Sequence, residues 1–238
     1  VAGSGKTTVA LHRISYLLYN YEDLYKPSEF CIIGSSDMLL HYIRSGLPEL
    51  DVHHIHEMRM DEIFPYLMEK AWKKQYQIVP DYPEAEIKSH LPFIRALDRF
   101  LTELTEEALN LSDITDPDLG VVLSLESMLE ARSYHPEDSL YQFEKHLNER
   151  ILSRLKFLCT ERSSDFKKAK RQAFRKYFDS SVRKWTVPGL YLAFLTELEE
   201  QDSSLDFSAT KAGVSKGKTD VYDAAAFGLI YRRIFQKQ

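Results

Sequence analysis

The chain has 238 residues, of which 44% are hydrophobic, and a formal net charge of −5. These values exclude a disordered segment and leave room for one sizeable core or two modest ones. The charge gives no overall basic signature, so any contact with nucleic acid must be local. No stretch has the roughly 20 apolar residues of a membrane span, and no secretory signal is visible. We therefore expect a cytoplasmic protein with no membrane partner.

The first eight residues contain most of a phosphate-binding loop. Val1-Ala2-Gly3-Ser4-Gly5-Lys6-Thr7-Thr8 matches the pattern G-x-x-x-x-G-K-[ST] except for its first glycine, which would precede Val1 by one residue. We therefore expect this chain to be a fragment of a longer nucleotide-binding protein.

The residue types in this loop suit the chemistry of ATP and Mg²⁺. Gly3 and Gly5 let successive backbone N–H groups face the phosphates, and the following helix adds its positive end. Lys6 can bridge the β- and γ-phosphates, the Thr7 hydroxyl can ligate Mg²⁺, and the Thr8 N–H can reach the α-phosphate. The alternative is a Gly/Ser turn followed by a solvated lysine. We assign ATP binding to residues Ala2, Gly3, Ser4, Gly5, Lys6, Thr7 and Thr8, with Lys6 and Thr7 as the catalytic pair and Thr7 as the metal ligand.

Hydrolysis also needs an acidic group on the metal, usually at the end of an apolar strand. Asp61-Glu62 is the nearest acidic pair, but it leads into a helical pattern and belongs in a first helical turn. We therefore expect the Asp-Glu motif to lie beyond Gln238 and this chain alone to show weak or absent ATP turnover.

The order of elements predicts an α/β fold interrupted by a helical insertion. Residues 5–20 predict a helix, 30–34 a buried strand, 37–50 a second helix and 52–58 a second strand, as in a parallel, doubly wound sheet. Residues 1–58 would then be the N-terminal part of a RecA-like P-loop domain, partial because its first strand is missing. We expect an all-helical insertion at 59–201, a Ser/Gly/Lys-rich linker at 202–219 and a return to the RecA-like domain at 220–238. Helical patterns within or after the insertion cover residues 63–76, 84–109, 121–131, 136–158, 165–178, 188–198 and 221–235.

Charge is unevenly distributed within the expected insertion. Residues 98–130 carry nine acidic groups and one basic group, whereas 161–184 carry nine basic and three acidic groups. Solvated helix faces, or two halves that neutralise each other, are the first interpretation. The second assigns the basic segment, with Phe174, Tyr177 and Trp185, to nucleic acid or an acidic protein surface, although such aromatic residues more often lie in a core.

The histidine and cysteine patterns predict neither a metal site nor a disulfide. His53, His54 and His56 cluster, but no further ligands are spaced for a metal, so surface or edge positions are expected. Cys31 and Cys159 lie far apart in apolar contexts and are expected to be reduced core residues.

The residues after the loop resemble a known family. Gly3 to Tyr19 is similar to the first motif of superfamily 1 helicases of the UvrD/Rep class, in particular the HelD-type, helicase IV-like branch. Residues 31–34, 39–43 and 47–50 resemble that branch's next strand and helix, with Ser35-Ser36 in place of its usual turn residues. Residues 223–233 are similar to the helix before the family's Asp-Glu motif.

This resemblance implies two RecA-like domains with an insertion in the first, and a DNA helicase or translocase that hydrolyses ATP on single-stranded DNA. The alternative is an RNA polymerase-binding recycling factor, in which the helical insertion is the interaction module and ATP is a switch. In that case the resemblance implies that acidic side chains of the insertion occupy a channel built for phosphate.

Overall fold

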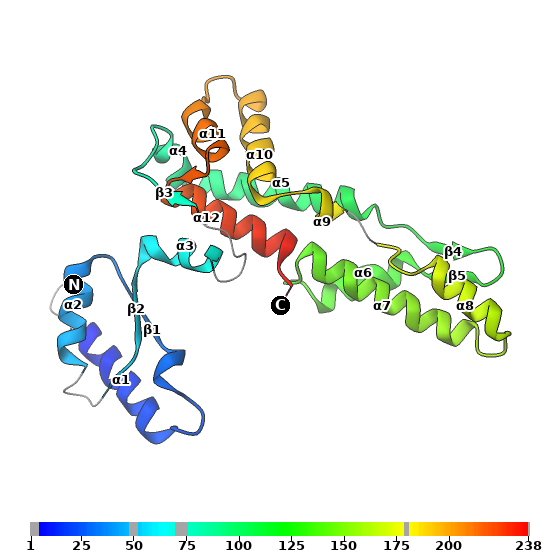
Figure 1. Cartoon of the computed structure of the whole chain (residues 1–238), viewed down its shortest axis with the longest axis horizontal. Helices are drawn as coiled ribbons and strands as arrows, with labels where there is room; N and C mark the ends of the chain where they lie inside the picture. Colours follow the sequence, from blue (N-terminus) through cyan, green and yellow to red (C-terminus); the bar gives the residue numbers. More distant parts are fainter. Residues whose placement is uncertain (1–4, 48–51, 70–75, 179–180, 238) are drawn as a thin grey trace. The chain divides into compact units, whose positions relative to one another are not determined.

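The structure is a computed structural model that describes residues 5–47, 52–69, 76–178 and 181–237. The chain divides into two compact units, Val1–Leu67 and Met68–Gln238. Helices dominate both units, and the described strands form three two-stranded sheets, two of them parallel (Figure 1). The fold is therefore of the α/β class with a strong excess of helix. The division at Leu67 lies nine residues after the domain boundary expected at residue 58.

The first unit is built around one pair of parallel strands. Its elements are α1 (Lys6–Asn20), the 3₁₀ turn η1 (Pro27–Glu29), β1 (Cys31–Gly34), α2 (Asp37–Gly46), β2 (His56–Arg59), the 3₁₀ turn η3 (Met60–Glu62) and α3 (Ile63–Leu67). Cys31 lies opposite His56 and Gly34 lies opposite Arg59 in the strand register. The helix between the strands makes this a β-α-β connection, the arrangement expected of a parallel sheet.

Local sequence explains how α2 sits on these strands. The Ser36 hydroxyl caps the helix by accepting the Leu39 N–H at 3.3 Å. Leu40 and Ile43, three residues apart, are the buried positions of the helix. A Cβ added at Gly34 would lie 2.8 Å from Leu40, so only glycine permits this close approach at the end of β1.

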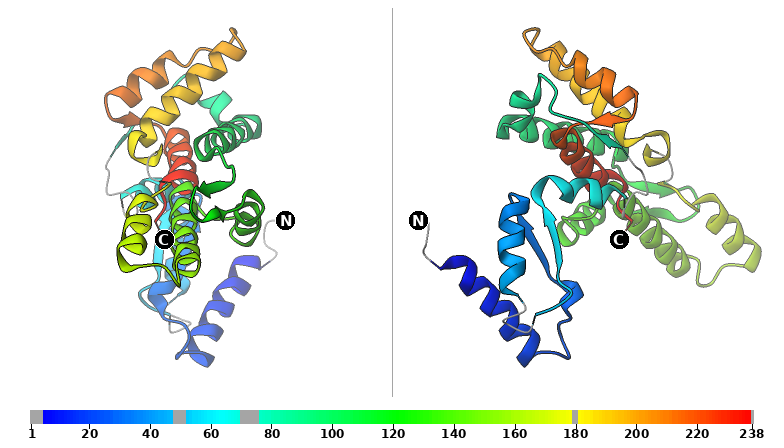
Figure 2. Two further views of the ribbon diagram at one scale, coloured as in Figure 1. Left: turned by 90° about the vertical axis from the view of Figure 1, so that its right-hand side faces the viewer. Right: turned by 60° about the vertical axis from the view of Figure 1, so that its left-hand side comes forward.

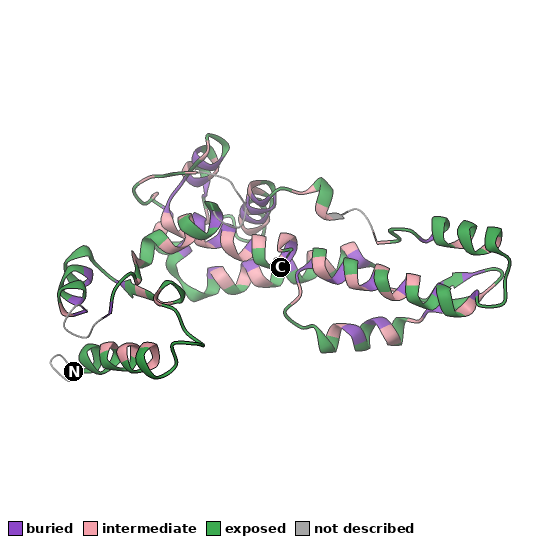
Figure 3. Cartoon of the chain, turned by 60° about the horizontal axis from the view of Figure 1, so that its bottom comes forward, coloured by how far each residue is buried: buried purple, intermediate pink, exposed green. Residues whose placement is uncertain are grey.

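The α1 helix follows the predicted range closely but buries no residue (Figure 3). On its predicted apolar side Val9 is 59% exposed, whereas Ile14, Leu17 and Leu18 are half-buried. The strand predicted at 30–34 is confirmed as β1, whereas the second strand starts at His56 rather than residue 52. The predicted end of the second helix, at 48–50, falls outside the described residues, and the described helix ends at Gly46.

One part of the second unit is a helical core around α12 (Figure 2). Its elements are β3 (Gln77–Ile78), α4 (Ala85–Ser89), α5 (Leu91–Leu109), α10 (Val187–Gln201), α11 (Ser208–Ser215), β6 (Lys218–Thr219), α12 (Val221–Ile230) and the π-helical turn η5 (Tyr231–Phe235). This core buries four phenylalanines, Phe93, Phe194, Phe207 and Phe227. The rings of Phe93 and Phe194 pack edge to face with their centroids 5.3 Å apart.

The other part of the second unit is organised along α7. Its elements are β4 (Ile114–Asp116), β5 (Gly120–Leu123), α6 (Leu125–Tyr134), α7 (Leu140–Leu158) and α8 (Ser164–Ala173), and the short α9 (Ser181–Lys184) leads from α8 to α10. The α7 helix buries Phe143, Leu147, Ile151 and Leu155, which recur every four residues and form one stripe. It contacts β5, α8 and η5, so η5 connects this part to the helical core.

The expectation of an all-helical insertion at 59–201 is wrong. Ile114–Asp116 and Gly120–Leu123 pair as an antiparallel hairpin, and the helix predicted from residue 121 starts instead at Leu125. Asp116 accepts the Asp118 and Leu119 N–H groups, and Gly120 has φ +72°, a conformation that glycine adopts at low cost. The D-P-D-L-G turn between β-branched residues was the signal for this hairpin. Within 84–109, Pro92 stands in the first turn of α5, so the predicted single helix is two.

The segment predicted as a linker at 202–219 contains a packed helix. Thr210, Gly213 and Val214 of α11 are buried, and α11 contacts α10 and β6. Thr219 of β6 pairs with Ile78 of β3. Residues 220–238 also belong to the second compact unit and not to the unit that contains the loop, because α12 packs against α4, α5 and α10. The segment is rich in small and polar residues, which is typical of a linker. Here these residues instead allow α11 to pack closely against its neighbours.

Both cysteines are free thiols. Cys159 is buried, whereas Cys31 is exposed in the two-stranded sheet formed by β1 and β2. The expectation that Cys31 is a core residue is wrong. Across the described ranges, none of the helices combines the length and the apolar character that crossing a bilayer requires.

Candidate functional site

The described part of the predicted phosphate loop is a left-handed glycine directly before the start of α1. Gly5 has φ 73° and ψ 7°, the left-handed conformation, and the helix begins directly after it at Lys6. The Gly5 carbonyl accepts the Val9 N–H at 2.9 Å, the first hydrogen bond of the helix. A Cβ at Gly5 would meet nothing within 4 Å, so the backbone conformation and not crowding favours glycine here.

The first turn of α1 presents its polar groups to solvent. Lys6, Thr7 and Thr8 are exposed, and the first turn contains no acidic residue. No side chain of the described residues caps this helix start. The first-turn N–H groups and the positive end of the helix dipole therefore favour an anion, and the Lys6 ammonium adds a full positive charge.

The structure covers only the second half of the predicted site. It brings Gly5, Lys6, Thr7 and Thr8 together at one helix terminus, whereas Ala2, Gly3 and Ser4 fall outside the described residues. The donor set that is described, one ammonium, two hydroxyls and the first-turn N–H groups, fits a triphosphate with a divalent cation.

A charged cluster lies where β2 ends. Arg59 donates to Asp61 through Nε at 2.8 Å and also contacts Asp37 at 3.3 Å. The hydrogen bond from Arg59 lowers the pKa of Asp61, and the hydrogen bonds to Asp61 and Asp37 raise the pKa of Arg59. Glu62 accepts the Arg59 N–H at 2.8 Å, which caps the 3₁₀ turn η3. The prediction that Asp61-Glu62 starts a helical segment is confirmed, and both carboxylates are used locally.

Basic side chains line a hollow of about 770 Å³ between the C-terminal half of α7 and α8. Lys156, Lys167, Lys168 and Arg171 contribute to its wall, and Phe157 in the same wall is 68% exposed. Of the aromatic residues highlighted in the basic segment, Phe174 is buried, Tyr177 is 51% exposed and Trp185 is half-buried. Only Phe174 thus has the expected core position.

One basic side chain neutralises part of the acidic segment. Lys170 Nζ lies 2.8 Å from both carboxylate oxygens of Asp116 and 2.6 Å from Asp118 Oδ2. Burial raises the pKa of Asp116, but the hydrogen bond and charge of Lys170 and the Asp118 and Leu119 N–H groups together outweigh it, so the pKa is lowered. The two oppositely charged segments therefore meet at this point, as the first interpretation expected, whereas Glu103, Glu106 and Glu107 of α5 remain exposed.

The histidines found by sequence and by structure differ. His53, His54 and His56 are exposed, with the first two rings 6.4 Å apart. Over the described ranges, the group with metal-ligand geometry is instead His135, Asp138 and His146. The signal for it was H-x-x-D followed by a histidine in the next helix, which the sequence interpretation passed over.

No family model, no curated protein and no solved structure matches the chain. Function is therefore inferred from the loop sequence, from the geometry of α1 and from the charged surfaces described above.

Proposed function

We propose that the chain is the ATP-binding portion of a superfamily 1 helicase or translocase, and that MgATP binds at the N-terminus of α1. The observation that supports this most directly is the left-handed Gly5 immediately before an exposed Lys6-Thr7-Thr8 turn without acidic residues. A phosphate loop requires this combination of a glycine turn, a helix start and a lysine.

Each residue has a distinct role in this proposal. Lys6 holds the β- and γ-phosphate oxygens as a point charge, and Thr7 offers its hydroxyl to Mg²⁺. Thr8 and the loop residues before Gly5 contribute backbone N–H groups. In the full reaction, Mg²⁺ neutralises the charge that develops on the transferred phosphoryl group.

The helicase assignment rests on the resemblance of Gly3 to Tyr19 and on the order β1, α2, β2, which suits a RecA-like domain. The basic hollow supports single-stranded DNA as the partner. Lys167, Lys168 and Arg171 can follow a phosphate backbone, and the exposed Phe157 offers a ring on which a base can stack. ATP hydrolysis would then drive movement on DNA or remodelling of a nucleic-acid complex.

Calorimetric titration with MgATP tests the nucleotide site. We expect Lys6→Ala to weaken binding about 10- to 100-fold, the loss expected from charged hydrogen bonds worth about 1.5–3 kcal/mol. Thr7→Ala should reduce the dependence of binding on Mg²⁺, and Thr7→Ser should retain it. Arg13→Ala removes a positive charge from the exposed surface of the same helix and is the matched control. Absence of binding by the unmodified chain, or equal affinity in the Lys6 and Arg13 variants, would contradict the proposal.

Anisotropy of a labelled single-stranded oligonucleotide tests the DNA partner separately. The triple variant Lys167→Glu, Lys168→Glu, Arg171→Glu should abolish binding, and the affinity of the unmodified chain should fall steeply with salt. Charge reversal at Lys145, which is exposed at 64% of its side chain elsewhere on α7, is the control. Unchanged DNA affinity in the triple variant would exclude this surface, whatever the ATP result.

A further inference from the structure

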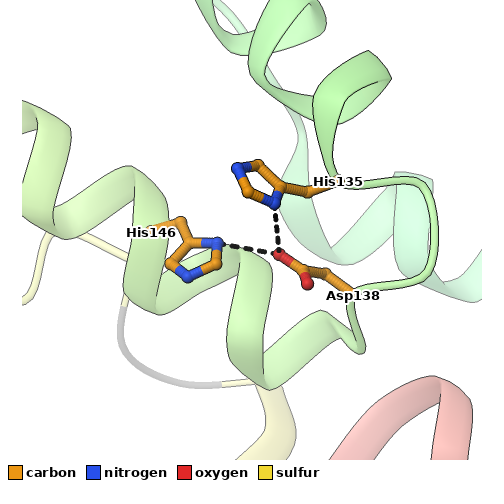
Figure 4. A group of neighbouring side chains, drawn as sticks. All are labelled: His135, Asp138 and His146. Carbon is orange, nitrogen blue, oxygen red and sulfur yellow. Dashed lines mark ion pairs between the residues drawn. The ribbon is translucent and has the colours of Figure 1, made fainter.

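Three potential metal ligands converge where α6 turns into α7 (Figure 4). His135 follows the last residue of α6, Asp138 lies in the connecting loop, and His146 lies in the second turn of α7. His146 Nδ1 is 2.7 Å and His135 Nδ1 is 4.0 Å from the same oxygen, Oδ2 of Asp138. The three ligand atoms lie within 4.8 Å of one another.

Two of these atoms lack the partners that buried polar atoms normally have. Asp138 Oδ2 and His146 Nδ1 are shielded from solvent, and apart from their mutual contact at 2.7 Å neither has a hydrogen-bond partner within the described ranges. A carboxylate oxygen and an unprotonated imidazole nitrogen both present lone pairs, and they repel each other unless a proton or a cation is shared. Natural proteins rarely leave buried polar atoms unsatisfied, so the pair shares a proton or a cation. The second imidazole, His135, faces the same oxygen and favours the cation.

The surrounding contacts hold the ligands in place from several sides. The Asp138 carbonyl accepts from Arg132 at 3.1 Å, and its N–H donates to the His135 carbonyl at 3.3 Å. The Ser139 hydroxyl donates to the Gln236 carbonyl at 2.6 Å, which ties the loop to the segment after η5. The hydrogen bond from Arg132 goes to the backbone oxygen of Asp138 and not to its carboxylate.

We propose that His135, Asp138 and His146 bind one Zn²⁺ ion. Two imidazole nitrogens and one carboxylate oxygen form a donor set that suits zinc and is unlike the all-oxygen sets of Mg²⁺ or Ca²⁺. Bonds of about 2.0–2.1 Å in a tetrahedral site separate ligand atoms by roughly 3.3 Å, a value between the observed 2.7 and 4.0 Å. The fourth position is left for water, and the ion links the end of α6 to α7 independently of the nucleotide site.

Titration with ZnCl₂ by calorimetry, and with CoCl₂ by visible absorption, tests this site. The unmodified chain should bind one ion, and Co²⁺ should give the intense visible bands of a tetrahedral nitrogen and oxygen site. His146→Gln and Asp138→Asn keep the shape of the side chains but remove a ligand. Each should weaken binding by more than about 100-fold, because loss of even an outer-shell partner costs about 10- to 100-fold.

Two comparisons keep the test decisive. The double variant His54→Ala, His56→Ala removes two exposed histidines of the other cluster and should bind Zn²⁺ like the unmodified chain. Circular dichroism of the ligand variants, expected to be unchanged without metal, separates loss of ligation from loss of folding. Absence of binding by the unmodified chain, an affinity of His146→Gln and Asp138→Asn equal to that of the unmodified chain, or loss of binding only in the His54/His56 variant would overturn the proposal.

Discussion

Lys88 Nζ lies 2.8 Å from Asp223 Oδ1, and both side chains are completely inaccessible to solvent. The same ammonium contacts Asp220 and the Thr210 hydroxyl, so one cation from α4 serves the two carboxylates that cap α12. Burial raises the pKa of Asp223, although the charge of Lys88 opposes that shift. The pairing joins segments more than 130 residues apart in sequence and closes the core of the second unit.

We expect Lys88→Met to lower the free energy of unfolding by about 3–5 kcal/mol, because it leaves buried carboxylates without their counter-charge. Urea denaturation followed by circular dichroism measures this change. Lys145→Met, at a solvent-exposed position, should change stability by no more than about 0.5 kcal/mol. A loss below about 1 kcal/mol for Lys88→Met would show that the buried network contributes little.

Tyr191 should make the chain sensitive to alkali. Its hydroxyl donates to Asp223 Oδ1 at 2.8 Å, and burial, followed by the charge of Asp223, raises its pKa well above 10. A raised folded-state pKa means that the stabilising contribution is fully present below the unfolded pKa of about 10 and is lost as the pH rises above it.

Urea midpoints measured between about pH 8 and pH 11 test this expectation. Tyr191→Phe should lower stability at pH 8 by about 1–2 kcal/mol and should reduce the further loss at high pH. Tyr134→Phe, at a 68% exposed position, is the control and should follow the unmodified chain. Identical alkaline profiles for Tyr191→Phe and the unmodified chain would contradict the assignment.

Asp116 should contribute to stability only while it is ionised. Its lowered pKa means that the contribution is present above the unfolded value of about 3.8 and is lost as the pH falls through the lower folded-state pKa. Asp116→Asn should therefore flatten the acid side of the stability profile below about pH 4. Asp118→Asn, which removes the more exposed partner of Lys170, should have the smaller effect. If the stability of Asp116→Asn and of the unmodified chain depends on pH in the same way below about pH 4, the ion pair between Asp116 and Lys170 does not contribute as expected.

Gly5 and Gly120 form a matched pair for testing the nucleotide loop. Both have a left-handed backbone, and neither has an atom within 4 Å of an added Cβ. Alanine at either site should therefore cost about 1–2 kcal/mol of backbone strain. Only Gly5→Ala should also weaken MgATP binding, as measured by calorimetry. Equal MgATP affinity in the two variants would indicate that the turn before α1 does not position phosphate.

Elements with strong local signals were predictable from sequence, and those defined by distant partners were not. The α1 helix and β1 follow uninterrupted patterns, and their bounds differ from the prediction by one residue at most. The hairpin at 114–123 was missed because its strands are short and stand between long helices. The α11 helix resembled a linker because its stability depends on contacts with α10 and β6, which composition does not reveal.

The same distinction applies to the sites. The predicted phosphate loop is contiguous, so its residues could be proposed from spacing alone, and the structure places Gly5 to Thr8 at a helix start. Lys88, Asp220 and Asp223 meet only through the tertiary fold, and no short pattern connects them. The sequence could in principle have predicted the group of His135, Asp138 and His146, because these residues lie within one loop and the start of the next helix.

The β3–β6 pairing has a consequence for the order of events during synthesis. In the described sheet, Gln77 and Ile78 gain their strand partner only when Lys218 and Thr219 have been made, and Asp220 is made 132 positions after Lys88. At about 5–20 residues per second, a ribosome needs roughly 7–26 s to cover that interval. During this time α4 and α5 leave the exit tunnel with the apolar sides that later cover α12 still unpaired. The nascent chain is therefore most open to chaperone capture, and to premature contacts with neighbouring chains, until residues 218–230 emerge.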